Sequence, residues 1–465
     1  MSLKHLELKI NKQKPFENCK LNRSKYASVL TSIIENYSEG FVMAINNKWG
    51  TGKTTFVKMW EQSLKNSGYE TIYFNAWEND FDNNPLTALI GELKILRPTD
   101  DQNFKKVISS AAKLSKNIAP ALVKAILNKY LDSEILVDSL TDSVKTGTEI
   151  FEEEIKEYAN KKKSITDFRI ELSQFVSKNS NGKPLIFIID ELDRCRPNYS
   201  VSLLEQVKHF FSVKNIVFIL SIDKEQLGNA ICGAYNSDKI DSSEYLRRFI
   251  DIEYSIPEPK NGEFFNYLFD YFDYGSFFNS NERLQHYEFK YDSEIFVSIS
   301  QLLLQKCNLR ELEKIMATTR MTLRTFDQNS YVLPVFYIYL IYIKFIHNSF
   351  YKNLISKNLT LLEAQNEFYN IIKSYLNKDN KRYFIQIEGL LLIYYNNYLF
   401  KNRENEIYEY DMLAARYKLN VKSKINDIEL LNFYRDCYNG HSNYLELKLD
   451  YFINKIELID SFKFD

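Results

Sequence analysis

The sequence is poor in the residues that form disulfides and hold metal ions, with five cysteines and five histidines among 465 residues. The cysteines lie far apart and include no C-x-x-C pair; they are Cys19, Cys195, Cys232, Cys307 and Cys437. An odd number of scattered cysteines argues against a disulfide framework and predicts reduced thiols in the cytoplasm. The histidines are equally scattered, so we predict no metal cluster built from protein side chains alone.

The chain also has almost no net charge and no long apolar run. Its formal net charge is −1, so charge does not indicate a nucleic acid as a partner. The three lysines 161–163 predict a solvated helix face rather than a basic patch. The one stretch that resembles a membrane helix, 331–343, is shorter than the required length of about 20 residues and is followed by Lys344. The chain begins without an apolar leader core. We therefore expect a cytoplasmic protein that does not enter a membrane, with 331–343 as a buried helix.

An apolar run that ends in two acids is the most informative segment. Residues 186–189 are Ile-Phe-Ile-Ile, and Asp190 and Glu191 follow directly. Such a run is typical of a strand buried on both faces, and its carboxyl end is where open parallel sheets bind ligands. We therefore predict that both acids face a site. The alternative is a pair of solvated acids at the start of a loop. Asp193 and Arg194 are expected to pair with each other in a structural role.

A glycine-containing segment upstream is the predicted partner of these acids. Residues 50–55, Gly-Thr-Gly-Lys-Thr-Thr, follow the strand-like run 41–45 and precede a helical pattern from Phe56. A helix N-terminus holds anions through unpaired N–H groups and a partial positive charge, and glycine lets the backbone approach closely. We predict a nucleoside triphosphate site, with residues 47–54 as the candidate phosphate loop. An ordinary glycine turn that caps a helix is the alternative.

The residue types in this loop predict their roles. Lys53 would reach the outer phosphates, and Thr55 the inner phosphate. Thr54 and Asp190 would bind magnesium, and Glu191 would orient and deprotonate the attacking water. The predicted nucleotide contacts in this segment come from Asn47, Trp49, Gly50, Thr51, Gly52, Lys53, Thr54 and Thr55.

Asn47 departs from the pattern G-x-x-x-x-G-K-S/T, which has glycine at this position. Asparagine tolerates a left-handed backbone better than other residues with a side chain, so we expect the loop to form.

Together with these two segments, five matches occur in order along the chain, namely 21–27, 49–54, 74–77, 190–195 and 245–249 with 256–259, and a weaker one follows at 308–312. Through these segments the sequence resembles the KAP family of P-loop NTPases over about residues 20–260. The resemblance implies ATP as the nucleotide, a helical lid after the sheet and frequent association into oligomers. Many bacterial members resemble phage-exclusion proteins or the ATPase of multi-gene anti-phage systems.

Further polar residues are expected to act around the nucleotide. Ser221 or Asp223, at the end of a strand-like run, would read the terminal phosphate, unless Asp223 instead caps the next helix. Arg248, or Arg247 in another register, would reach the terminal phosphate of a neighbouring subunit, with a surface salt bridge as the alternative. Arg310 resembles a sensor that closes the lid onto nucleotide.

The strand-like runs set the predicted organisation. Runs 40–46, 69–77, 185–190, 215–223 and 251–256 alternate with helical patterns, as in a parallel α/β sheet. We predict an α/β fold: a P-loop NTPase parallel sheet with a helical insertion and an all-helical C-terminal lid domain. The predicted boundaries are 1–99 and 183–260 for the core, 100–182 for the insertion, and 261–465 for the lid and C-terminal domain.

Two parts of this organisation leave alternatives. The insertion, interrupted by Pro120, forms either an arm that contacts partners or a helical pair packed beside the sheet. Tyrosines of the C-terminal half fall on helical stripes with few basic residues, which favours core packing over stacking platforms for single strands.

The predicted function is hydrolysis of ATP with Mg²⁺. The resemblance extends this to a switch or motor in a bacterial, anti-phage complex, formed with further copies of the chain or with other proteins of a multi-gene system. An ATP-binding scaffold with little turnover is the alternative. A P-loop kinase is disfavoured because no acceptor pocket is recognisable.

Overall fold

The computed structural model divides the chain into two compact units. The first, which we call the sheet unit, spans Leu8–Glu258, and the main part of the second, the helical unit, is Pro259–Asp465. The structure describes residues 9–37, 40–81, 84–96, 102–116, 147–180, 182–210, 213–237, 239–258, 261–400, 407–411, 416–439 and 446–458.

The sheet unit is built on five parallel strands in the order β2-β3-β4-β1-β5. The strands are β1 (Phe41–Asn46), β2 (Thr71–Asn75), β3 (Leu185–Asp190), β4 (Ile216–Ile222) and β5 (Ile252–Tyr254). The predicted parallel α/β sheet is therefore confirmed, with β2 and β5 shorter than expected. Every residue of β3 and β4 is buried, because helices cover both faces of the sheet.

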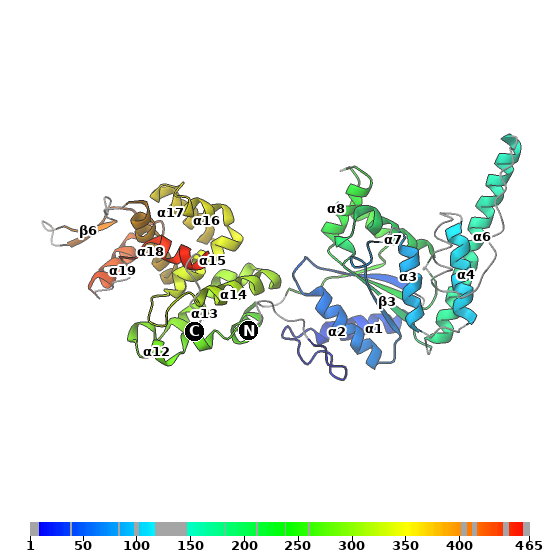
Figure 1. Ribbon diagram of the computed structural model, residues 1–465, viewed down its shortest axis with the longest axis horizontal. Helices are drawn as coiled ribbons and strands as arrows, with labels where there is room; N and C mark the ends of the chain where they lie inside the picture. The colour runs from blue at the N-terminus through cyan, green and yellow to red at the C-terminus, as the bar shows by residue number, and fades with distance from the viewer. Residues whose placement is uncertain are drawn as a thin grey trace. The chain divides into compact units, whose positions relative to one another are not determined.

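Helices on the two faces give the sheet two separate cores (Figure 1). On one face lie α1 (Ser24–Asn36) and α2 (Lys53–Asn66), and on the other lie α3 (Pro85–Leu93), α7 (Pro197–Phe210), α8 (Lys224–Ala234) and α9 (Ser242–Arg247). Ile186 and Ile188 of β3 pack toward α2, whereas Phe187 and Ile189 pack toward α7. Because strand side chains alternate, Asp190 falls on the α2 face.

Two long helices come from the predicted insertion, α4 (Gln102–Lys116) and α6 (Gly147–Asn179), and they lie side by side (Figure 1). Phe168, Leu172 and Phe175 of α6 are buried in the core that also contains α3 and α7. The C-terminal part of the insertion therefore packs beside the sheet. Pro120 lies outside the described residues, and a partner-binding arm remains a prediction. Lys162 and Lys163 are exposed on α6, as expected of a solvated helix face.

The helical unit contains the remaining described α-helices, the short 3-10 helices η3 (Tyr287–Phe289) and η4 (Leu304–Lys306), and one hairpin. The helices are α10 (Asn261–Tyr271), α11 (Gly275–Phe278), α12 (Asn281–Leu284), α13 (Asp292–Leu303), α14 (Leu309–Leu323), α15 (Pro334–Ile346), α16 (Asn348–Ile355), α17 (Leu361–Ile372), α18 (Lys381–Leu399), α19 (Asp427–Asn439) and α20 (Leu449–Ile456). The hairpin pairs β6 (Tyr408–Asp411) with antiparallel β7 (Arg416–Leu419), and the sequence did not predict it.

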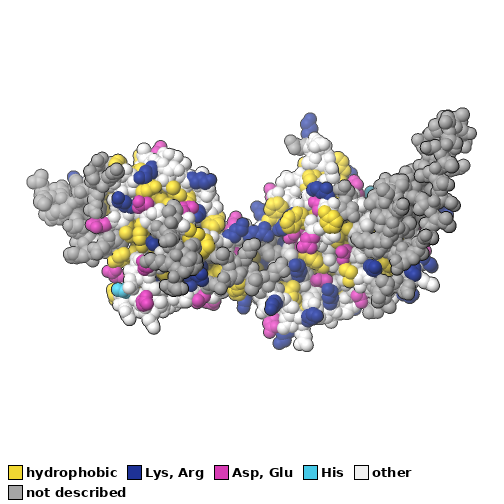
Figure 2. All heavy atoms as spheres, in the orientation of Figure 1, with side chains coloured by type: hydrophobic (Ala, Val, Ile, Leu, Met, Phe, Trp, Pro, Cys, Tyr) yellow, Lys and Arg dark blue, Asp and Glu magenta, His cyan; other side chains and the backbone are white. Residues whose placement is uncertain are grey.

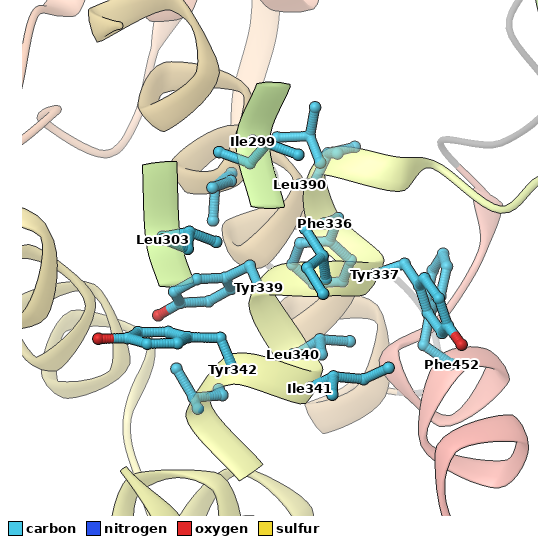
Figure 3. Close-up of a cluster of buried hydrophobic side chains, with 14 of the residues drawn as sticks. Ile299, Leu303, Phe336, Tyr337, Tyr339, Leu340, Ile341, Tyr342, Leu390 and Phe452 are labelled. Atoms are coloured by element: carbon cyan, nitrogen blue, oxygen red, sulfur yellow. The ribbon is translucent and has the colours of Figure 1, made fainter. Parts of the chain in front are cut away.

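Aromatic side chains fill the core of the helical unit. The apolar stretch that resembled a membrane helix forms α15, whose residues from Pro334 to Ile343 are all buried. Figure 3 shows side chains of α15 packed with Leu303 of α13, Leu390 of α18 and Phe452 of α20. Tyrosines 337, 339, 394 and 395 are likewise buried. These positions confirm core packing rather than a stacking platform. None of the helices within the described residues is both long and apolar enough to cross a lipid bilayer.

Candidate nucleotide site

The candidate phosphate loop turns tightly between β1 and α2. Gly50 and Gly52 both have a φ of 80°, in the left-handed region that side chains with a Cβ enter at a cost. Gly52 precedes α2, so the helix begins at Lys53. The first N–H groups of α2 lack partners within the helix and lie at its positive end. This geometry suits an anion in the loop. Thr54 and Thr55, predicted to contact magnesium and phosphate, lie in the first turn of α2 and are half-buried.

Asn47 supports this loop in a way that the sequence did not predict. Its backbone is not in the left-handed region, so the expected reason for its tolerance is wrong. Its side-chain amide instead forms two hydrogen bonds with one residue beyond β5: Nδ2 donates to the carbonyl of Ile256 at 2.7 Å, and Oδ1 accepts from the Ile256 N–H at 2.9 Å. Its own N–H donates to the carbonyl of Ile222 at the end of β4, at 3.1 Å. Asn47 therefore fastens the loop to two strand ends.

Lys53 is a buried cation at the centre of the loop. Its Nζ donates to the carbonyl oxygen of Asn47 and, at 3.2 Å, to that of Lys48. Burial lowers the pKa of Lys53, and the negative charges of Asp193, Asp223 and Asp190, in that order of size, oppose this shift. The ammonium group is thus held by two backbone carbonyl oxygens of the loop.

Arg23 binds the loop through hydrogen bonds that the sequence did not predict. It precedes α1 and is only 5% exposed, and burial lowers the pKa of its guanidinium. Its Nη2 donates to the carbonyl of Thr51 at 2.7 Å, and its Nη1 donates to that of Gly52 at 3.0 Å. In a trans peptide the N–H points opposite to the C=O. Arg23 therefore turns the N–H groups of Gly52 and Lys53 to the other side, away from its own guanidinium.

Asp190 is fixed by two hydrogen bonds at the carboxyl end of β3. Its Oδ2 accepts from the hydroxyl of Tyr73 on β2 at 2.8 Å, and its Oδ1 accepts from the N–H of Glu191 at 2.9 Å. Burial and the charge of Asp190 raise the pKa of Tyr73, so the phenol stays a donor. Ser221 lies opposite Asp190 in the β3–β4 register. Its fully buried Oγ has no hydrogen-bond partner within the described residues.

Glu191 has an unusual backbone for a residue with a side chain. Its φ of 61° and ψ of 24° are left-handed, a conformation that costs about 1–3 kcal/mol and is concentrated at functional sites. Its Oε1 lies 2.7 Å from Nη1 of Arg194. The expected Asp193–Arg194 pair is therefore wrong, because Arg194 pairs with Glu191. The short 3-10 helix η2 (Leu192–Arg194) follows directly.

Two acids hold Trp49 at the tip of the loop. Asp193 Oδ2 accepts a hydrogen bond from the indole Nε1, and Asp223 Oδ2 accepts one from the backbone N–H of Trp49 at 3.1 Å. Burial raises the pKa of Asp193, against the opposing effects of the Trp49 hydrogen bond and of Lys53. Asp223 Oδ1 also accepts from the N–H of Gln226 and so caps α8, at 3.4 Å. The capping alternative for Asp223 is thus confirmed, and its role as a phosphate sensor stays a prediction.

The predicted arginines lie outside this network of contacts. Arg247 and Arg248 are exposed at the C-terminal end of α9, and Nη1 of Arg247 lies 2.9 Å from Oε2 of Glu244. The salt-bridge alternative is therefore realised for Arg247. Arg310 is exposed in the first turn of α14 in the helical unit. Its sensor role, like that of Arg248 in a neighbouring subunit, stays a prediction.

Comparison with known proteins agrees with this architecture. Residues 23–339 match the KAP family P-loop domain, which is more than half of the chain. The chain belongs to the KAP family. It is 24% identical over 258 residues to the phage T7 exclusion protein of Escherichia coli, covering 50% of this chain and 32% of that protein. The chain thus spans about a third of the length of this relative.

Two further comparisons are with archaeal proteins. An uncharacterized protein of Methanocaldococcus jannaschii is 42% identical over 177 residues, covering 32% of this KAP chain and 88% of that protein. The ORC2 protein of Aeropyrum pernix, solved in ADPNP-ADP complexes, superposes with a TM-score of 0.33 at 12% identity, covering 89% of this chain and 94% of that chain.

The role of Arg23 can be tested by substitution. We expect Arg23→Ala to weaken ATP binding at least about tenfold, because two charge-assisted hydrogen bonds to the loop are lost. Isothermal titration calorimetry would measure the affinity. The control is Lys25→Ala, which removes an exposed cation that lies 5.0 Å from the ring of Tyr26. Equal affinities for Arg23→Ala and the parent protein would show that Arg23 does not organise the loop.

Proposed function

We propose that this KAP chain binds ATP with Mg²⁺ and hydrolyses it. The observation that carries the proposal is the convergence of Lys53, at the start of α2, with Asp190, at the end of β3, across the carboxyl edge of the sheet. A cation for the outer phosphates and a carboxylate for the metal are two of the groups that P-loop NTPases use in phosphoryl transfer.

The residues present suit a magnesium ion. Among the described residues, no group of three or more His, Cys, Asp or Glu side chains could hold a metal by itself. Magnesium does not need one, because it is usually held by one or two protein ligands together with phosphate oxygens and waters. Asp190 and the Thr54 hydroxyl are the proposed ligands, with Tyr73 orienting the carboxylate. Bound magnesium would neutralise charge on the phosphate oxygens.

The neighbouring polar groups are assigned to the attacking water and the terminal phosphate. We assign Glu191 to orient and deprotonate the water, because it directly follows Asp190 and is held in a left-handed conformation. The buried hydroxyl of Ser221, which has no partner within the described residues, is a candidate donor to the water or to a phosphate oxygen.

The wider role that we propose is a nucleotide-driven switch or motor in an anti-phage complex. It is supported by membership of the KAP family and by similarity to a protein described as a phage T7 exclusion protein. We propose other copies of the chain, or other proteins of a multi-gene system, as partners. Nucleic acid is not included, because the chain has a formal net charge of −1 and the face shown in Figure 2 intersperses basic and acidic side chains over each unit.

Substitution of Lys53 tests nucleotide binding. We expect Lys53→Ala to lose almost all measurable affinity for ATP in calorimetry, because Lys53 is the buried lysine of the loop and the other lysine of the loop, Lys48, is exposed. Lys48→Ala is the matched control, since Lys48 is an exposed lysine of the same loop. Unchanged affinity in Lys53→Ala would contradict the assignment of this loop to phosphate.

Substitution of Glu191 tests hydrolysis separately from binding. We expect Glu191→Gln to keep ATP affinity and to slow phosphate release about a hundredfold or more, because glutamine has nearly the same shape but cannot accept the proton. Glu225→Gln, at an exposed acid in the first turn of α8, serves as the control. Equal turnover in Glu191→Gln and the parent would move the role to another acid, with Asp193 next. ATP binding without turnover in the parent protein would indicate a scaffold.

The intersubunit role of Arg248 can be tested by mixing variants. An arginine that reaches the terminal phosphate in trans increases the rate about a thousandfold or more. An Arg247→Ala, Arg248→Ala double variant and a Glu191→Gln variant each lack a different part of the site. In a mixed assembly one complete site is rebuilt, so we expect phosphate release to reappear. If the two variants co-assemble in size-exclusion chromatography and the mixture stays inactive, the arginines do not act between subunits.

A further inference from the structure

The amide of Asn47 binds a segment that leads out of the sheet unit. Residues 255–258, which we call the exit segment, follow β5 and end where the sheet unit ends, at Glu258. The Ile256 side chain is only 2% exposed and belongs to the core beneath α1 and α2. Its N–H and C=O both bind the side chain of Asn47, 209 residues earlier in the sequence. A side-chain amide thus supplies the two hydrogen bonds that a neighbouring strand would supply.

The backbone carbonyl of Asn47 is bound by Lys53, the buried cation of the phosphate loop. Nζ of Lys53 donates to the Asn47 carbonyl oxygen. A lysine that binds an outer phosphate directs its ammonium group to the phosphate oxygens instead. Lys53 therefore binds the main chain of Asn47, and the exit segment binds the side chain of Asn47. Glycine, which the sequence pattern has at this position, could form only the main-chain contact.

We propose that Asn47 is a coupling residue, through which nucleotide bound at Lys53 changes the stability of the exit segment. The inference rests on the proposed binding of ATP. It assigns Asn47 a positioning role in place of the direct nucleotide contact expected from the sequence. The Ile256 N–H reports on the coupling, because its acceptor is Asn47 Oδ1. Residue 257 is proline and has no N–H, so a peptide of the exit segment gives few competing signals.

Hydrogen exchange measured by mass spectrometry tests the proposal. The probe is ATP with Mg²⁺, added to full-length chains that also carry Glu191→Gln so that nucleotide is retained. In the chain with Asn47 intact, we expect ATP to change exchange in the exit segment at least about threefold. In Asn47→Gly and Asn47→Ala we expect exchange without nucleotide to be about tenfold faster, because the acceptor of the Ile256 N–H is lost. ATP, at a concentration that saturates each variant in calorimetry, should then cause no further change.

The two substitutions and a control separate the amide from other effects. Asn47→Ala removes the amide without adding glycine's backbone freedom, so both variants must behave alike. The control is Asn46→Ala, because the side chain of Asn46 binds Glu253 and the N–H of Lys224, which both lie outside the exit segment. This control should keep the response to ATP. Circular dichroism would verify that every variant is folded.

Each other outcome overturns the coupling. A response to ATP that survives in Asn47→Ala would show that the amide does not carry it. Affinity lost more than about tenfold in both variants would make Asn47 a nucleotide contact. If the intact chain binds ATP in calorimetry and its exit segment does not respond, the coupling fails and the proposed function stands. If the intact chain does not bind ATP, the proposed function itself fails.

Discussion

Burial of a cation where β1 turns into α2 places a strong requirement on the surrounding residues. An ammonium group loses its hydration when it is buried, and it keeps its charge only if acceptors and opposite charge lie near. The loop carbonyls accept hydrogen bonds from Lys53, and the negative charges of Asp190, Asp193 and Asp223 favour its charged form. These acids lie at or beyond the ends of β3 and β4, and β4 lies between β3 and β1 in the sheet. The strand order therefore brings them to the cation.

The loop is held from outside by contacts with separate parts of the sheet unit. Arg23 binds two carbonyls at the start of α2, and Trp49 is held at the tip by Asp193 and Asp223. Asn47 joins the base of the loop to Ile256. None of these contacts uses the first N–H groups of α2. A site that is organised in this way before its ligand binds has a smaller free-energy cost of reorganisation on binding. This is the basis of electrostatic preorganisation.

Several residues were assigned to the right part of the molecule for an incorrect or incomplete reason. Asn47 fits the loop through its amide, because its backbone is not left-handed. Glu191, for which no special conformation was expected, is the residue of the site that adopts positive φ without being glycine. Arg194 pairs with Glu191 because the turn η2 brings residues three apart together, leaving Asp193 to the indole of Trp49. In each case the local pattern located the residue, and the surrounding fold selected its partner.

The sequence by itself determined the five strands, the presence of a helix after the loop, the glycines of the loop and the burial of α15, because each depends on residues that are neighbours in the chain. The tertiary structure decided which polar groups meet. Arg23 forms a hydrogen bond with Thr51, which is 28 residues later in the sequence. Tyr73 binds Asp190, 117 residues later, and Asn47 binds Ile256, 209 residues later. A sequence shows donors and acceptors, but many pairings of them are equally compatible with its pattern. Only the folded sheet, by placing particular strand ends side by side, selects one pairing and excludes water from it.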